Sequence, residues 1–394
     1  GRGATNSTSC RKVRNHVASR VPKGTRWLQQ GCQSQKIIHK ESGLRSVKPP
    51  EAVSSFHTFQ HRFHPDPMRF LISILALALA LPAVGQNPLQ RDEDPIPAAV
   101  ENIYTRGLRY LSKTQKDDGS WADGVGSEPG VVGLAVMAFL AHGEDPNHGE
   151  YAENIKRGIT YILTQQDSGN GYIGNSMYTH GFATLALAEC YGMYRDDKIA
   201  KGLKKAVELI LSAQKRNPRG GWRYSPDATT SDTSIAGCQI VALYAARNAG
   251  IPVPDAALEK GMKFMRKCRG SDGGYGYQNA MGDRPTLTAI GLLCESLAKQ
   301  HKTKLYAASA KYLAKKLNHR ESHYAYYFEY YMAQALFHSN EETWQEWNAK
   351  NTRYLGALQG PDGSFPGSRG KSFNTSGALL SLALNYRFLP IYEK

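Results

Sequence analysis

One ten-residue pattern recurs six times in this chain, with decreasing fidelity, about every 50 residues. It consists of a basic residue, a small residue, an aromatic-aliphatic pair and a glutamine. The best copy spans residues 106–115 and is closed by Gly119 and Trp121. A fixed period of this size indicates equivalent supersecondary units, none of which can bury its apolar face alone.

The glutamine and the closing aromatic residue show how the copies differ. Four copies keep both, as Gln115 with Trp121, Gln166 with Tyr172, Gln214 with Trp222, and Gln359 with Phe365. The fourth copy has Arg269 in place of the glutamine and keeps Tyr275, and the fifth has Leu317 and no closing aromatic residue. A glutamine can satisfy backbone groups at a helix end that water cannot reach, so we interpret these residues as scaffold.

Each unit also has a second half that repeats. An alanine- and leucine-rich run, almost free of charge, follows the closing aromatic residue and starts at Gly133, Gly181, Gly237, Gly291 and Gly377; the fifth unit has a run at Tyr330 instead. Such runs predict helices buried on nearly all sides, whereas the segments before them keep an apolar stripe beside a charged face. The sequence therefore predicts an all-α fold of six helix pairs over residues 98–390.

Six helix pairs could stack as an open solenoid or close into a ring. Closure hides both end faces, and the chain lacks obvious polar capping repeats. We therefore expect an (α/α)6 toroid with buried inner helices around a central cavity.

The repeat resembles that of the terpenoid cyclase and protein prenyltransferase superfamily, called the QW motif in squalene cyclases. The resemblance covers roughly residues 95–390. It implies the same toroid, in which the glutamine joins a loop to the next helix end and the aromatic residue stacks over it. It also implies that working residues lie at the starts of the inner helices and face the cavity.

The N-terminal residues predict a separate organisation. Residues 68–85 have a basic start, a twelve-residue apolar core and small residues before Gln86, which is typical of a secretory signal peptide cleaved near Gly85-Gln86. We interpret residues 1–67 as sequence upstream of a wrongly assigned start, or else as a disordered leader. Residues 86–97 are polar and Pro-rich and predict a linker. These features predict an exported protein, periplasmic or secreted.

The basic balance of the chain does not point to nucleic acid. Of the formal charge of +15, residues 1–67 carry +9 and Arg69 one more, which leaves +5 from Gln86 onward. That is an ordinary surface for about 300 residues, and no nucleic-acid-binding motif is present. We also expect no permanent transmembrane helix, because the apolar core of residues 70–81 is too short. The oligomeric state is left open.

Four cysteines fall within the predicted toroid, namely Cys190, Cys238, Cys268 and Cys294. Their spacing fits no zinc site, and they could pair in three ways or remain buried thiols. The resemblance brings no metal either, because Ser234 stands where the prenyltransferases have a zinc-binding cysteine. We expect no metal and no cofactor.

Asp232 is the first candidate catalytic residue. It lies in Ser231-Asp232-Thr233-Ser234, which loosely resembles the acid motif of class II terpene cyclases but keeps one aspartate of it. Such enzymes protonate an alkene with a carboxylic acid kept neutral by burial. The alternative is an N-cap, which favours the charged carboxylate.

His180 precedes a shared glycine and is the second candidate, as a cavity acid or base, against the alternative of a satisfied polar group at a helix end. Tyrosines are dense between residues 324 and 331, and aromatic faces can stabilise carbocations or stack on sugars. The candidate substrate-binding residues are Tyr178, Thr233, Tyr324, Tyr326, Glu329, Tyr330 and Asn374.

The sequence thus favours an exported toroid that binds a ligand, apolar and isoprenoid-like or carbohydrate, or a partner peptide in its central cavity, without a complete known catalytic motif. One alternative is a class II terpene cyclase-like isomerase that uses Asp232. A second is a polysaccharide lyase-like enzyme that uses His180 and cavity tyrosines.

Overall fold

A computed structural model describes residues 95–392. This part of the chain contains twelve α-helices, α2 to α13, two short 3-10 helices, and no β-strand beyond two isolated bridges. The predicted leader (1–67), the signal peptide (68–85) and all of the predicted linker except residues 95–97 lie outside the described residues.

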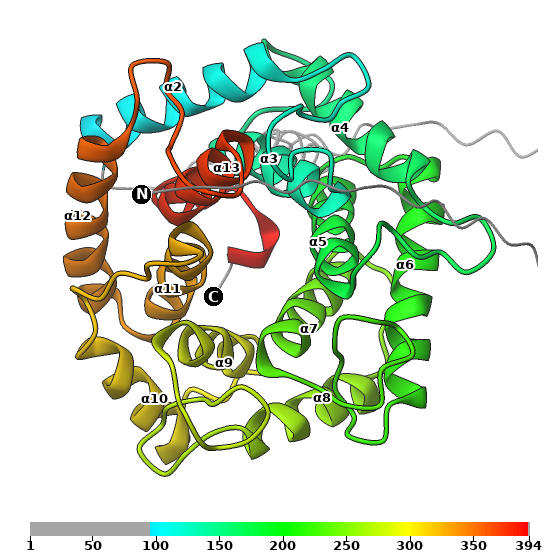
Figure 1. The fold of residues 1–394 in the computed structure, drawn as a ribbon, viewed down its shortest axis with the longest axis vertical. Coiled ribbons are helices and arrows are strands. Elements are labelled where there is room, and N and C mark those ends of the chain that lie inside the picture. Colours follow the sequence, from blue (N-terminus) through cyan, green and yellow to red (C-terminus); the bar gives the residue numbers. More distant parts are fainter. Residues whose placement is uncertain (1–94, 393–394) are drawn as a thin grey trace, which may run out of the picture. The chain divides into compact units, whose positions relative to one another are not determined.

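The helices alternate between an outer and an inner layer around a ring (Figure 1). The outer helices are α2 (Ala98–Thr114), α4 (Ala152–Thr164), α6 (Asp197–Arg216), α8 (Asp255–Lys267), α10 (Lys304–Ala314) and α12 (Glu341–Leu358). The inner helices are α3 (Pro129–His142), α5 (Met177–Met193), α7 (Thr233–Asn248), α9 (Pro285–Leu297), α11 (Ala325–Ser339) and α13 (Lys371–Leu382). The last pair packs against the first, α13 on α2 and α3 and α12 on α2, which confirms the closed (α/α)6 toroid.

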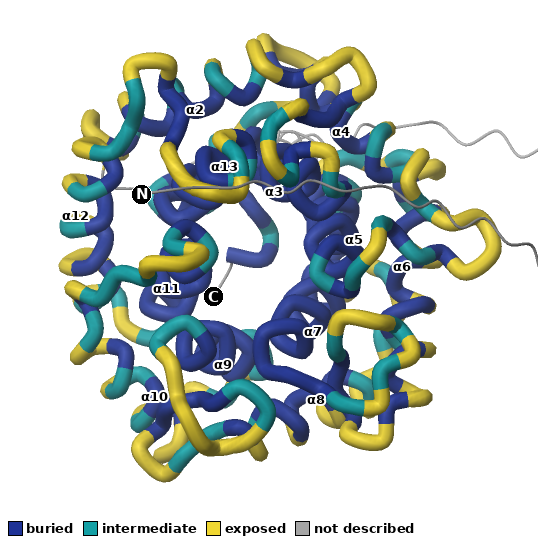
Figure 2. The backbone as a smooth tube through the Cα atoms, in the orientation of Figure 1, coloured by how far each residue is buried: buried dark blue, intermediate teal, exposed yellow. Residues whose placement is uncertain are grey.

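Burial separates the two layers as the apolar runs predict (Figure 2). In α3 every residue except His142 is buried, because it contacts both neighbouring inner helices and the outer layer. Helix α6, in contrast, buries one face that includes Leu203 and Ile210, and exposes its lysines. The half-exposed helices therefore form the outside and the uncharged helices the inside.

The four repeat glutamines make the same pair of contacts. Each side-chain amide donates to the carbonyl of the loop glycine in its own repeat and to a carbonyl near the start of the next outer helix, at 2.9–3.0 Å. Gln359 reaches Ile103 of α2 in this way and so closes the ring between the last and the first repeat. Trp121 and Trp222 each donate their indole N–H to a carbonyl of the preceding outer helix.

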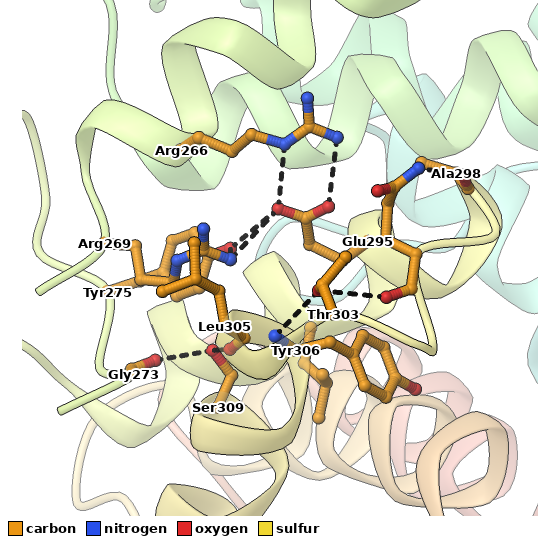
Figure 3. A network of polar contacts seen from close by, with 12 residues as sticks. Arg266, Arg269, Gly273, Tyr275, Glu295, Ala298, Thr303, Leu305, Tyr306 and Ser309 are labelled. Atoms are coloured by element: carbon orange, nitrogen blue, oxygen red, sulfur yellow. Dashed lines mark hydrogen bonds and ion pairs between the residues drawn. The ribbon is translucent and has the colours of Figure 1, made fainter. Parts of the chain in front are cut away.

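The fourth repeat replaces this contact with an ion pair (Figure 3). Arg269, in place of the glutamine, lies 3.2 Å from the buried Glu295 carboxylate of α9, and Arg266 contacts both oxygens of that carboxylate. Tyr275, in place of tryptophan, directs its hydroxyl toward Glu295 as well. The substitution of arginine for glutamine is thus matched by a buried carboxylate that needs a cation.

The C-terminal segment, residues 383–392, enters the space inside the inner helices, here called the lumen (Figure 1). It contains the 3-10 helices η1 (Ala383–Asn385) and η2 (Pro390–Tyr392). Helix η1 contacts α13, α3 and α11, whereas η2 contacts α5 and α7 on the opposite side of the ring, so the segment crosses the lumen. Leu389, Ile391 and Tyr392 are buried there, and Ile391 N–H donates to the Glu189 carboxylate of α5.

Candidate functional site

A cavity of about 370 Å³ lies where the inner helices begin. Because every inner helix is entered from the end of an outer one, all six run in the same direction and start at the same end of the ring. The cavity is lined by the starts of α3, α5, α11 and α13, by the loops before them, and by Tyr224 in the loop before α7. Its volume is at the low end of the range for small-molecule sites.

The walls of the cavity are largely aromatic and aliphatic. The lining residues of this kind are Val125, Val131, Leu134, Tyr178, Phe182, Tyr224, Tyr324, Tyr327 and Phe373. Such a surface gains from covering an apolar or flat ligand, since the stabilisation scales with the apolar area removed from water.

An aromatic contact across the lumen forms part of the cavity wall. Tyr178 of α5 and Tyr327 of α11 come from opposite sides of the ring, with ring centres 6.0 Å apart and hydroxyls 3.5 Å apart. Phe182 packs edge-on against Tyr327 and against Tyr330, which lies further along α11. Burial raises the pKa of the Tyr327 hydroxyl well above its ordinary value, so it stays a neutral hydrogen-bonding group. The cavity is therefore bounded in part by aromatic side chains that reach across the lumen.

Glu128 provides the one carboxylate among the lining residues. It precedes α3, and both of its oxygens accept hydrogen bonds from α5 or the residues before it, one from Asn175 Nδ2 and one from Thr179 Oγ1, each at 3.1 Å. These contacts hold Glu128 against the α5 side of the opening.

Tyr324 and Arg369 form the opposite side of the opening. Tyr324 precedes α11 with φ = 60°, a left-handed conformation that costs a non-glycine residue roughly 1–2 kcal/mol. The Arg369 guanidinium lies 4.6 Å from the centre of the Tyr324 ring and donates a hydrogen bond to its hydroxyl. A strained, half-exposed aromatic residue held at the opening of a cavity is a candidate ligand contact.

Asp232 lies behind the cavity wall rather than in it. It is the N-cap of α7, and its Oδ1 accepts from Ile235 N–H at 2.9 Å and from Ser234 Oγ at 2.7 Å. Its Oδ2 accepts no hydrogen bond from a described residue and lies 3.8 Å from Arg223 Nε. Burial raises the pKa of this carboxyl, against the hydrogen bonds and the arginine, which lower it. Asp232 thus has both the N-cap geometry and a carboxyl that burial pushes toward the neutral form.

His180 is fully buried between the loop of its repeat and an outer helix. Its Nδ1 accepts from Ile173 N–H at 3.1 Å, and its Nε2 lies 3.0 Å from the Ala206 carbonyl of α6. Burial lowers the pKa of His180 to about 4, so the ring is neutral with the proton on Nε2. Both ring nitrogens are engaged, and His180 does not line the cavity.

The candidate binding residues divide into two groups. Tyr178 and Tyr324 line the cavity, and Tyr330 packs against Phe182, which also lines it. Thr233, Tyr326, Glu329 and Asn374 do not line it. Thr233 donates to the Gly276 carbonyl of the next repeat, and Tyr326 donates to the Pro366 carbonyl.

Glu329 and Asn374 are buried in the wall of the ring. Glu329 lies 4.0 Å from Arg320, and neither of its carboxylate oxygens accepts a hydrogen bond from a described residue. Burial raises the pKa of Glu329 to about 8, although Arg320 lowers it. The Asn374 amide lies close to Gly367, in the loop before α13.

Three of the lining residues that set the charge and polarity of the opening were missed by the sequence reasoning, namely Glu128, Asn175 and Arg369. They lie in loops just before inner helices, at positions that differ from repeat to repeat. The repeat pattern locates these loops but does not show which of their side chains turn inward.

We also searched residues 95–392 for reactive cysteines, metal sites and membrane-spanning helices. The four cysteines of the toroid are buried free thiols, and burial raises the pKa of Cys190 to about 12. Within residues 95–392, no three His, Cys, Asp or Glu side chains gather as metal ligands would. None of the helices in this part of the chain has the length and apolar character needed to span a bilayer.

Comparison with known proteins supports the fold. No family model matches the chain, and no curated protein matches it. Among solved structures, the chain is similar to the type II terpene cyclase MstE from Scytonema, at 14% identity and a TM-score of 0.54, over 74% of this chain and 99% of that one. It is also similar to the alpha-1,6-mannanase GH76A from Salegentibacter, at 11% identity and a TM-score of 0.55, over 72% of this chain and 98% of that one.

Both neighbours are (α/α)6 toroids, so the likeness confirms the toroid fold that the repeat of this chain predicts. One is named as a cyclase and the other as a mannanase. A fold that carries such different chemistries identifies no activity, and function has to be argued from the site.

Proposed function

We propose that this protein binds a small ligand with an apolar body in the cavity at the start of its inner helices, without transforming it. The observation that carries the proposal is the aromatic cavity itself, whose wall includes the Tyr178–Tyr327 contact across the lumen. Phe182, Phe373 and Leu134 offer an apolar surface, so an isoprenoid-like or similar chain fits this lining better than a sugar does.

Two of the structural neighbours are complexes with small ligands. One MstE structure contains geranylgeranyl dihydroxybenzoate, and one structure of the mannanase contains alpha-1,6-mannotriose. These ligands belong to the two classes that the sequence left open, and the apolar lining of this cavity favours the first.

Binding without catalysis is supported by how the acidic groups are placed. Glu128 is the lining carboxylate, and both of its oxygens already accept hydrogen bonds. Asp232, the candidate acid, does not line the cavity, whereas the tyrosines Tyr178 and Tyr224 do. Glycoside hydrolysis by the common route needs two carboxyl groups flanking the scissile bond, which the lining does not provide.

Filling the cavity tests the proposal. Decanol serves as a neutral apolar probe, and its affinity is measured by isothermal titration calorimetry. We expect Leu134→Trp to weaken decanol binding about tenfold or more, because the indole occupies the volume that the probe needs. The matched control is Leu305→Trp, on the exposed surface of α10.

Equal affinity of the native protein and Leu134→Trp, with both folded by circular dichroism, would exclude this cavity as the binding site. If Leu134→Trp does not fold, Val131→Phe places a smaller side chain in the same wall and answers the same question.

The second candidate function is a cyclase-like isomerase with Asp232 as general acid. The specific observation in its favour is that Oδ2 is buried, free of hydrogen bonds from described residues, and part of a carboxyl whose pKa burial raises. Such an acid would protonate an alkene of a polyprenyl substrate. Cyclised products formed by the native protein and absent with Asp232→Asn would support it, and no turnover by the native protein would remove it.

The lyase alternative has less support, because both ring nitrogens of His180 are hydrogen-bonded away from the cavity. Export rests on residues 68–85 and is proposed from the sequence. Sequencing the N-terminus of the natural protein tests it, with Gln86 expected as the first residue. A mature chain that keeps residues 1–67 would refute export by this signal.

A further inference from the structure

We infer that the cavity takes a ligand with an oxyanion head group, and that Arg369 at its opening binds this head. The inference rests on the proposed binding function and names the chemical class of the ligand. The juxtaposition that carries it is a guanidinium without an acidic partner among the described residues, at the edge of a cavity whose walls are largely aromatic and aliphatic.

The first step concerns the hydrogen bonds that Arg369 makes. A guanidinium has five N–H donors in a planar fork that matches carboxylate or phosphate oxygens. Within residues 95–392, the Arg369 side chain donates to the Tyr324 hydroxyl and has no carboxylate within 4.0 Å. The neighbouring cation differs, since Lys371 pairs with Asp362 at 2.8 Å. Arg369 therefore keeps its remaining donors for a ligand.

The second step concerns the position of the guanidinium. Stacking on Tyr324 fixes its plane at the opening, and Tyr324 is itself fixed by its left-handed backbone at the start of α11. A fixed planar donor loses less side-chain freedom when it binds than a freely rotating one does. The contact thus holds Arg369 ready at the edge of the cavity.

The third step concerns the electrostatic environment. The inner helices all start at this end, and the partial positive charges of helix starts favour an anion. On the Arg369 side, the N-cap residues of α11 and α13, Tyr324 and Gly370, provide no capping side chain. Ser176, in contrast, caps α5 on the other side, where Glu128 is also held. The backbone N–H of Ser372 in α13 donates to the Asp123 carboxylate, which compensates part of the positive charge at the start of that helix. The uncompensated positive charge therefore lies mainly at the start of α11 and at Arg369.

The fourth step gives the orientation of the ligand. Its head group would lie between Arg369 and the start of α11, and its apolar body would extend along Phe373 and Leu134 toward the Tyr178–Tyr327 contact. The Glu128 side of the opening would repel the head group and so favour this single orientation.

The test compares ligands that differ in the head group alone. Decanoate, decyl phosphate and decanol are titrated calorimetrically against the native protein, Arg369→Gln and Arg353→Gln. Arg353 is an exposed arginine of α12 that does not line the cavity, so its variant is a control for the same loss of charge.

We expect the native protein to bind decanoate or decyl phosphate about tenfold or more tightly than decanol, because charge-assisted hydrogen bonds to the guanidinium add to the apolar contacts. Arg369→Gln should remove this preference for the charged head groups over decanol, whereas Arg353→Gln should keep it. A larger gain for decyl phosphate than for decanoate would identify the head as a phosphate, and the reverse would identify a carboxylate.

Equal binding of all three ligands by the native protein, or a preference that survives in Arg369→Gln, would overturn the inference and leave apolar binding in the cavity standing. Binding of none of them would overturn both. If Arg369→Gln fails to fold, Arg369→Lys keeps the charge without the planar fork and should retain part of the preference.

Discussion

At the end of the ring where the inner helices begin, the lumen holds a cavity of about 370 Å³, whereas at the other end it is filled by residues 383–392. The same helix contributes aromatic residues at two depths, since Tyr327 lines the cavity and Tyr331 is buried one turn further along α11. The composition of the inner helices therefore does not decide whether the lumen is hollow. What differs is that the chain's own C-terminal segment covers one end, and no described segment covers the other.

The two ends also differ in how their polar groups are satisfied. At the filled end, the C-terminal segment is held by carboxylates of three helices, in that Tyr386, Arg387 and Ile391 contact Glu101, Glu341 and Glu189 respectively. At the open end, Arg369 is left without an acidic partner among the described residues. The polar groups of the filled end are therefore paired within the protein, whereas the open end keeps hydrogen-bond donors of Arg369 for the proposed ligand.

The largest expected effect separates these two roles by stability. Leu389→Ala removes a fully buried side chain from the C-terminal segment and should lower the free energy of unfolding by about 2–5 kcal/mol. Phe373→Ala, in the partly exposed cavity wall, should cost less. Urea denaturation measures both, and a larger loss for Phe373→Ala would contradict the distinction between the two ends.

A second effect depends on pH and concerns the wall next to the open end. Glu329 has a folded-state pKa of about 8 against an ordinary value of 4.5, because burial disfavours its charged form. Its stabilising contribution is therefore fully present below about pH 4.5 and is lost as the pH rises through about 8. The variant Glu329→Gln should remove this dependence and be more stable than the native protein at pH 9. Parallel stability curves for the two proteins from pH 5 to pH 9 would show that Glu329 is not buried as described.

A smaller effect concerns ring closure, on which both ends depend equally. Gln359→Ala removes the two hydrogen bonds that join the last repeat to the loop and to α2, and should cost about 1–3 kcal/mol. Gln345→Ala, at an exposed position of α12, is the matched control and should be close to neutral. Thermal unfolding of both variants measures the difference. Equal melting temperatures would mean that the two hydrogen bonds of Gln359 do not stabilise the closed ring.

The repeat pattern predicted the fold because four of its six copies make the same contacts between neighbouring helix pairs. The apolar runs that begin with glycine predicted the inner helices. Glutamines such as Gln214 lie where one outer helix meets the start of the next. The replacement at Arg269 could not be interpreted from the pattern, since its partner Glu295 lies in the following helix and pairs with it through the fold.

The site was predicted less completely, because the repeat does not determine which side chains enter the lumen. Tyr178 and Tyr324 were expected to line the cavity and do so, while Glu329 faces Arg320 within the wall. One helical position decides such an outcome: Tyr326 and Tyr327 are adjacent, but the first packs on Phe365 and the second crosses the lumen. The C-terminal segment was missed as a cover, although its apolar residues Leu389 and Ile391 are a signal that it is buried.

The most direct measurement of the central claim is a crystal structure of the protein grown with decanoate. The claim is that the lumen has an open cavity at one end and is occupied by residues 383–392 at the other. The structure should therefore show the carboxylate on Arg369, the chain ending above Tyr178 and Tyr327, and residues 383–392 in place. Ligand density that runs past Tyr327 with the C-terminal segment displaced, or that lies on the outer helices with the cavity empty, would contradict it.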